Sequence, residues 1–205
     1  DNSNQINNPD LNDDHNTDSN LEANYFSSAS ILFTDFIGFT KITETIEPGE
    51  LIATLDEFFV GFDKICSKYK IKKVKTIGDS YMAVGGVPEG YPDHPRQTCL
   101  AALDIAEFVN GMNIQRKVLG KEPWKIRIGV HTGPIIAGSS GEQFDIWGDS
   151  VNIASRIEST GSEGKVHISN ATYEFIKDTS NVENRGSINL KNKGEMETLF
   201  LNGLD

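Results

Sequence analysis

Two aspartates stand where strand-like segments end, and both have the chemistry to bind a cation. Asp35 follows the apolar run at residues 30–34, and Asp79 lies in a Gly-Asp-Ser turn between two short strand-like segments. If those ends converge, two carboxylates repel each other unless a cation lies between them. Hard oxygen ligands suit Mg²⁺ or Mn²⁺. For either aspartate alone, local hydrogen bonds within a turn are the better explanation.

A second group of residues has the chemistry to bind phosphate. Gly38 stands at the entrance of an expected helix, where main-chain amides can point at an anion. Asn152 and Arg156 are four residues apart, so a helix would place them on one face. Away from a recognisable motif, a plain turn would be a plausible explanation of Gly38, and an Asn near a helix start with an exposed arginine would be the better explanation of Asn152 and Arg156.

Three segments carry a resemblance to a known family. They are residues 33–40 (FTDFIGFT), 73–82 (KVKTIGDSYM), and 126–134 (IRIGVHTGP) continuing to 143–156 (QFDIWGDSVNIASR). In this order they resemble the class III adenylate and guanylate cyclases, from about Ser30 to Leu201. The resemblance implies an α+β fold with a ferredoxin-like βαββαβ core, in which helices pack on a mainly antiparallel sheet.

The resemblance also implies metal and phosphate ligands. Asp35 and Asp79, with the carbonyl of Phe36, would hold two divalent metal ions, Mg²⁺ or Mn²⁺. These ions would assist attack of the ribose 3′-hydroxyl of ATP on the α-phosphate, giving 3′,5′-cyclic AMP and pyrophosphate. The β- and γ-phosphates would be received by the segment Gly38, Phe39 and Thr40.

The choice of purine is implied by Lys75 and Asp145. The family's adenylate cyclases carry Lys and Asp at these positions, whereas its guanylate cyclases typically carry Glu and a small residue such as Cys. A lysine donor and an aspartate acceptor match N1 and the 6-amino group of adenine. We therefore expect ATP as substrate, with a guanylate cyclase on the same fold as the alternative.

The remaining contacts implied by the resemblance are to ribose and phosphate. Asn152 would orient the ribose, and Arg156 would donate to the α-phosphate. Lys191 would contact the β- and γ-phosphates, although Lys193 is an alternative. Pro134 stands where some members carry a phosphate-contacting arginine, and proline cannot donate there.

The resemblance implies that each site forms between two chains. One chain would supply the metal-binding aspartates, and the other would supply the base-binding pair, Asn152 and Arg156. Because this chain has the whole set, we expect a head-to-tail homodimer with two equivalent sites. A catalytically silent nucleotide-binding or dimerisation module is a further alternative. A diguanylate cyclase is not indicated, because residues 85–88 (GGVP) do not match that family's signature.

The positions of these residues require a set of helices and strands. Apolar spacing predicts helices over residues 49–68, 96–113, 150–158 and 170–177. Short apolar or alternating runs predict strands over 30–34, 71–77, 81–84, 125–131, 135–137, 143–147, 166–169 and 198–201. His131 lies in one of these strands, and we expect it to be structural.

Composition limits the class of protein. The 205 residues carry a net charge of -11, without the basic excess that is typical of nucleic-acid binders. Residues 1–24 contain six acids and no Lys or Arg, and we expect a disordered linker there, with a catalytic domain over residues 25–205. We expect a cytoplasmic domain with no membrane segment, two reduced core thiols at Cys66 and Cys99, and an upstream regulatory domain in a longer protein.

Overall fold

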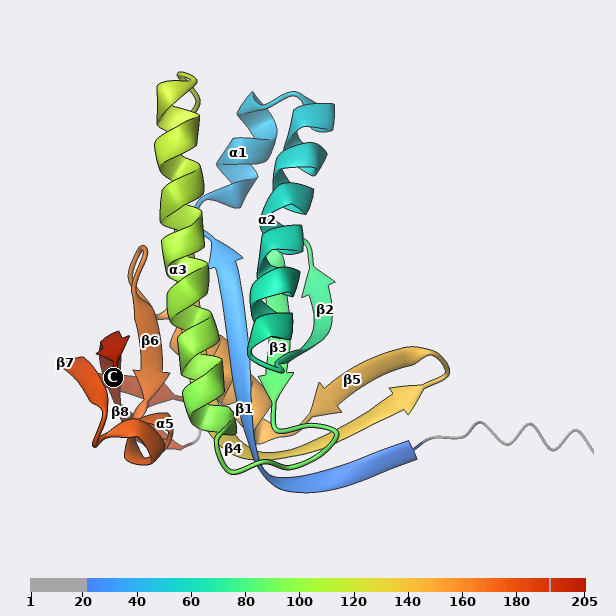
Figure 1. Cartoon of the computed structure of the whole chain (residues 1–205), viewed down its shortest axis with the longest axis vertical. Helices are drawn as coiled ribbons and strands as arrows, with labels where there is room; N and C mark the ends of the chain where they lie inside the picture. Colours follow the sequence, from blue (N-terminus) through green and yellow to red (C-terminus); the bar gives the residue numbers. More distant parts are fainter. Residues whose placement is uncertain (1–21, 192) are drawn as a thin grey trace, which may run out of the picture.

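The computed structural model describes residues 22–191 and 193–205, and in that part of the chain the backbone forms five helices and eight strands (Figure 1). The helices are α1 (Phe39–Thr45), α2 (Pro48–Lys68), α3 (His94–Val118), α4 (Asp149–Ser159) and α5 (Asn170–Ile176). The strands are β1 (Glu22–Phe36), β2 (Lys72–Ile77), β3 (Ser80–Gly85), β4 (Ile126–Ser140), β5 (Gln143–Trp147), β6 (Val166–Ser169), β7 (Ser180–Leu190) and β8 (Gly194–Leu204).

The strands form a single sheet in the order β2-β3-β1-β4-β6-β8-β7, and β5 pairs with β4. All neighbours are antiparallel except β4 and β6. The first four strands in this order, together with the helices that connect them, form the expected βαββαβ core. The prediction of helices on a mainly antiparallel sheet is therefore confirmed.

The two faces of the sheet have different cores. The long helices α2 and α3 lie on one face (Figure 1), where an aromatic cluster includes Phe36, Phe58 and Trp124, with ring centroids 4.9–5.5 Å apart. The opposite face packs Ile31 and Phe33 of β1 with residues of β3, β4, β5 and α4. Because side chains alternate along a strand, Asp35 lies on the same face as Ile31 and Phe33.

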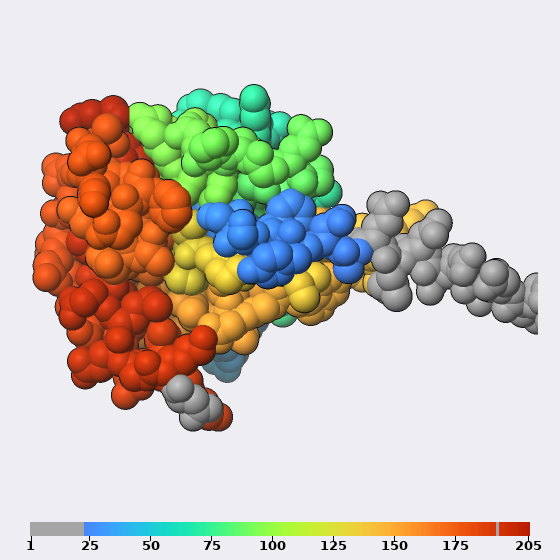
Figure 2. Space-filling model, turned by 90° about the horizontal axis from the view of Figure 1, so that it is seen from below, coloured from blue at the N-terminus to red at the C-terminus, as the bar shows by residue number. Residues whose placement is uncertain are grey.

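Strand β1 is longer than expected. It begins at Glu22, because its first residues pair with the end of β4, with Glu22 opposite Ser139. Figure 2 shows the start of β1 (blue) on the surface beside β4 (yellow). The prediction of a linker is therefore wrong for residues 22–24, and residues 1–21 lie outside the described residues.

Two further differences concern the strands. The segments predicted at 125–131 and 135–137 are one strand, β4, which continues through Gly133 and Pro134. Strand β7 was not predicted, because most of its side chains are exposed or half-buried at the edge of the sheet. Helix α3 is also longer than predicted, at both ends.

The expected environment of the two cysteines is confirmed. Cys66 and Cys99 are free and buried, and burial raises the pKa of the Cys66 thiol to about 11. Across residues 22–191 and 193–205, none of the helices has the length and apolar character needed to cross a bilayer.

Candidate active site

The two predicted metal-binding aspartates meet at one end of the sheet. Asp35 lies near the end of β1, and Asp79 lies in the turn that joins β2 to β3. The amide of Phe36 donates to Asp79 Oδ2 at 3.2 Å, and the hydroxyl of Ser80 donates to Asp35 Oδ1 at 2.6 Å. Burial, and then the negative charge of Asp35, raise the pKa of Asp79 above its ordinary value.

This pair of carboxylates fits a divalent cation. Their repulsion is relieved when a cation binds between them, and hard oxygen ligands match Mg²⁺ or Mn²⁺. Within the described residues, no cluster of three or more His, Cys, Asp or Glu side chains is arranged to hold a metal. The predicted ligand set, two carboxylates and the main-chain carbonyl of Phe36, is smaller than such a cluster, so substrate phosphates would have to complete the coordination of an ion here.

Arg127 and Glu158 also belong to this end of the sheet, and no role was predicted for either. Arg127 donates from Nη2 to Asp35 Oδ2 and from Nε to Glu158 Oε1, both at 2.9 Å. Burial raises the pKa of Glu158 to about 7, although Arg127 acts in the opposite direction. The signal in the sequence was weak, because an arginine in an alternating strand is usually interpreted as solvent-facing.

The structure brings together the residues predicted to bind the base. Lys75 of β2 and Asp145 of β5 are 70 residues apart, yet Lys75 Nζ lies 2.6 Å from Asp145 Oδ2. The other carboxylate oxygen of Asp145 accepts a hydrogen bond from the amide of Ile146 at 2.8 Å. Both side chains are partly buried. A fixed cationic donor and a fixed anionic acceptor are therefore held side by side.

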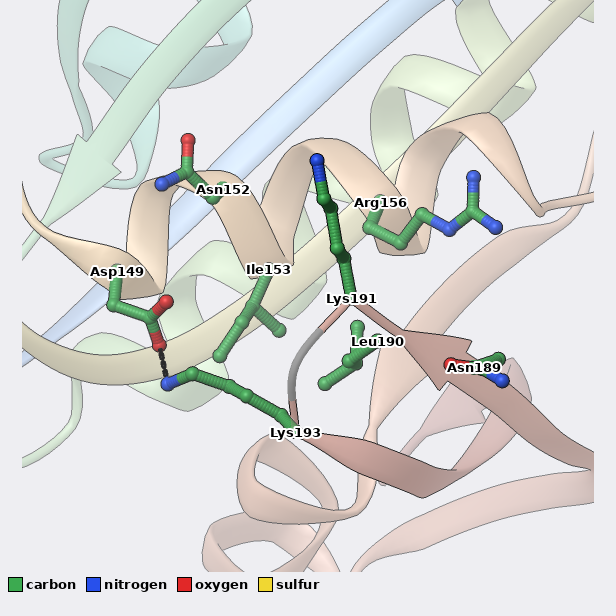
Figure 3. A pocket seen from close by; sticks show the side chains of 8 residues that line it. All are labelled: Asp149, Asn152, Ile153, Arg156, Asn189, Leu190, Lys191 and Lys193. Carbon is green, nitrogen blue, oxygen red and sulfur yellow. Dashed lines mark hydrogen bonds and ion pairs between the residues drawn. The ribbon is translucent and has the colours of Figure 1, made fainter.

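Helix α4 and the turn between β7 and β8 enclose a pocket of about 640 Å³ (Figure 3). The lining residues are Asp149, Asn152, Ile153, Arg156, Asn189, Leu190, Lys191 and Lys193. Figure 3 shows that the side chain of Lys191 points across α4 between Asn152 and Arg156. Lys193 instead forms an ion pair with Asp149. This arrangement favours Lys191 over Lys193 as the partner of Asn152 and Arg156.

The predicted phosphate-receiving segment forms the start of α1. Gly38 precedes this helix with φ of +72°, a left-handed conformation that glycine adopts without strain. Phe39 packs its ring against Trp124 at 5.8 Å between centroids, so its main chain, rather than its side chain, is available to an anion. Thr40 follows in the first turn of the helix.

His131 lies in the interior, in agreement with its expected structural role. It is 5% exposed, and its Nδ1 lies 2.8 Å from the hydroxyl of Ser169. Burial lowers the pKa of His131 to about 4, so the ring is neutral at pH 7.

Seven of the predicted residues thus form three groups in one chain. The first is Asp35 and Asp79, the second is Lys75 and Asp145, and the third comprises Asn152, Arg156 and Lys191. In the part of the chain that the structure describes, no hydrogen bond or ion pair joins one group to another.

Comparison with known proteins explains this combination of fold and residues. The adenylate and guanylate cyclase catalytic domain family matches residues 21–203. An adenylate cyclase of Mycobacterium tuberculosis is 38% identical over 187 residues, which cover 90% of this chain and 41% of the relative. The soluble guanylate cyclase subunit beta-2 of Rattus norvegicus is 39% identical over 190 residues, which cover 88% of this chain and 27% of the relative. The chain therefore spans less than half the length of either relative.

A solved structure gives the same result at the level of the fold. The catalytic core of a rhodopsin-guanylyl cyclase with converted specificity, in complex with ATPαS, superposes with a TM-score of 0.83 at 36% identity. The alignment covers 90% of this chain and 99% of that structure. This chain belongs to the adenylate and guanylate cyclase catalytic domain family.

Proposed function

We propose that this nucleotidyl cyclase domain uses ATP and releases 3′,5′-cyclic AMP and pyrophosphate. The observation that carries the choice of ATP is the contact between Lys75 and Asp145 at 2.6 Å. Adenine offers an acceptor at N1 beside a donor at its 6-amino group, which a lysine and a carboxylate can bind together. Guanine reverses both positions, with a donor at N1 and an acceptor at O6. With GTP, the ammonium group of Lys75 would therefore face the N1 donor of guanine, and the carboxylate of Asp145 would face the O6 acceptor.

The chemistry we propose uses each group for one task. Asp35, Asp79 and the Phe36 carbonyl would hold divalent ions, which when bound supply Lewis acidity at the ribose 3′-hydroxyl and the phosphates. Arg156 donates to the α-phosphate, where charge changes as the 3′-oxygen bonds to phosphorus. The bond from the α-phosphorus to the bridging oxygen breaks, pyrophosphate leaves, and the proton of the 3′-hydroxyl passes to water or to a phosphate oxygen of the substrate.

Three other parts of the chain position the nucleotide in this proposal. Asn152 orients the ribose from the same face of α4 as Arg156. Lys191, which lines the same pocket, binds the β- and γ-phosphates. The main chain at Gly38–Thr40 contacts the same phosphates from the start of α1. The pocket beside α4 has room for several of these contacts at once.

We also propose that two copies of the chain assemble head to tail. The support is that the three groups of residues are all present but no contact joins them within one described chain. A second copy would bring the aspartates of one chain to the base-binding pair and α4 of the other, and symmetry would give two equivalent sites. Activity per chain should therefore rise with protein concentration.

The test of purine choice is a comparison of ATP and GTP in the purified domain. Two mismatched hydrogen bonds cost at least about 2 kcal/mol, so kcat/KM should favour ATP by roughly 30-fold or more. The double variant Lys75→Glu with Asp145→Cys should lose that preference. Lys73→Glu is a matched control, because Lys73 lies on the same strand but pairs with Asp63 at 3.1 Å. A preference of the unmodified domain for GTP would overturn the proposal.

A further inference from the structure

The register of the sheet places Arg127 directly opposite Asp35. In the antiparallel ladder of β1 and β4, Asp35 and Arg127 are direct partners. Side chains at such paired positions emerge on the same face with their Cβ atoms about 4.5–5.5 Å apart. The register therefore keeps the Cβ atoms of Arg127 and Asp35 adjacent, and the contacts of the guanidinium decide where it lies.

The contacts of Arg127 define the orientation of the Asp35 carboxylate. Arg127 Nη2 donates to Oδ2 of Asp35 at 2.9 Å, while the hydroxyl of Ser80 donates to Oδ1 at 2.6 Å. Each carboxylate oxygen has a donor from a different strand, so rotation of the carboxylate breaks at least one hydrogen bond. Each oxygen also keeps acceptor capacity, because an ionised carboxylate has about four lone-pair positions for its two oxygens.

Glu158 holds Arg127 from the other side. Its side chain is 8% exposed, and its Oε1 accepts from Arg127 Nε at 2.9 Å. A buried carboxylate is costly unless it is paired, so Glu158 and Arg127 stabilise each other's position. When it is ionised, Glu158 also offsets the charge of Arg127, which would otherwise oppose the binding of a cation at Asp35.

A glycine allows this contact to form. A Cβ atom at Gly129 would lie 2.3 Å from the amide nitrogen of Glu158 and 2.6 Å from its Cα. Only glycine lets α4 approach β4 this closely. Two independent features, the register of β1 with β4 and the glycine two residues after Arg127, therefore bring Asp35, Arg127 and Glu158 together.

We propose that Arg127 is a positioning residue for the Asp35 carboxylate and that Glu158 anchors Arg127. This inference rests on the proposed role of Asp35 as a ligand of a divalent metal ion. Arg127 and Ser80 hold the carboxylate in one orientation beside Asp79, so that no orientational freedom is lost when the ion binds. Partners that orient a metal ligand in this way typically contribute 10–100-fold to metal affinity.

Two conservative variants test the positioning role, because one keeps the charge of the residue it replaces and the other keeps the shape. Arg127→Lys retains the positive charge but replaces the planar fork, which reaches two carboxylates, by a single ammonium group. Glu158→Gln retains the shape but removes the charge that offsets Arg127. Arg185→Lys is the matched control, since Arg185 is a part-buried arginine that donates to the main-chain carbonyls of Thr160 and Ser187 rather than to Asp35 or Glu158.

The measurement is Mn²⁺ binding to the nucleotide-free domain, with free Mn²⁺ detected by electron paramagnetic resonance. Arg127→Lys and Glu158→Gln should each raise the dissociation constant about tenfold or more, whereas Arg185→Lys should not change it. Thermal unfolding without metal identifies folded variants, and if one variant fails to fold, the other decides. The Mn²⁺ concentration for half-maximal cyclase activity should shift by the same factor as the dissociation constant.

Two results would overturn the inference, and they can be told apart. If Asp35→Asn loses Mn²⁺ binding but the folded Arg127→Lys and Glu158→Gln variants bind Mn²⁺ as the unmodified domain does, only the positioning role fails. If Asp35→Asn itself binds Mn²⁺ normally, the proposed metal site fails, and the positioning role fails with it.

Discussion

Substitution of Gly129 by alanine should displace the helix that carries Asn152 and Arg156. The added Cβ would lie 2.3 Å from the main-chain nitrogen of Glu158, and ordinary contact begins near 3.4 Å. Because the clashing atoms belong to the backbone, no side-chain rotation relieves the overlap. Helix α4 and strand β4 must therefore move apart by about 1.1 Å at this point.

The size of that movement sets two magnitudes. Overpacking of a well-packed interior costs about 1–3 kcal/mol, which corresponds to a fall in Tm of roughly 2–12 °C for a domain of this size. A displacement of about 1 Å in groups that position a substrate can reduce the rate about 100-fold. The loss of cyclase activity in Gly129→Ala should therefore be much larger than the loss of folded protein can account for.

The assay combines thermal unfolding with steady-state cyclase kinetics below the Tm of the variant. Gly111→Ala is the matched control, because a Cβ there meets nothing within 4 Å and the residue lies inside α3. Alanine at this helical position should stabilise the domain by about 0.5–1 kcal/mol without changing kcat/KM. If Gly129→Ala kept the Tm and kcat/KM of the unmodified domain, the argument that α4 depends on this close contact would be refuted.

Two further predictions concern protonation and phosphate binding. Burial lowers the pKa of His131 and His167 from 6.5 to about 4, so the unfolded chain binds protons more readily than the folded chain. Below about pH 6.5 each histidine should therefore remove up to roughly 1.4 kcal/mol of stability per pH unit, which Glu158, with its pKa raised to about 7, offsets only in part; a urea midpoint that is higher at pH 5 than at pH 7 would contradict this. Lys191→Ala should raise the KM for ATP about tenfold, the effect of one charge-assisted hydrogen bond. Lys193→Ala, which breaks an exposed ion pair, should change KM less than about twofold. A larger increase in KM from Lys193→Ala than from Lys191→Ala would instead assign the phosphate contact to Lys193.

Local sequence signals predicted much of the fold. The strand before Asp35, the hairpin around Asp79 and the helix that carries Asn152 and Arg156 all lie close to their expected positions, because each depends on apolar spacing within one segment. The same motifs named Lys75 and Asp145, which the structure places in direct contact.

Features that depend on distant segments were not predicted. Strand β7 has two shifts of register against β8, which break the period of two that would reveal a strand. The contacts of Arg127 join residues that are 92 and 31 positions apart, so they depend on sheet register and on the approach of α4 rather than on any local pattern. The start of β1 likewise depends on pairing with the far end of β4.

The most direct test of the account is the cyclic nucleotide formed by the purified domain at high concentration, with ATP or GTP and with Mg²⁺ or Mn²⁺. Asp35→Asn is run in parallel. We predict cyclic AMP from ATP, at a rate per chain that rises with protein concentration, and loss of this product in the variant. Cyclic GMP as the main product would contradict the role of Lys75 and Asp145. Nucleotide binding by a dimer that forms no cyclic product would contradict the assignment as an active cyclase.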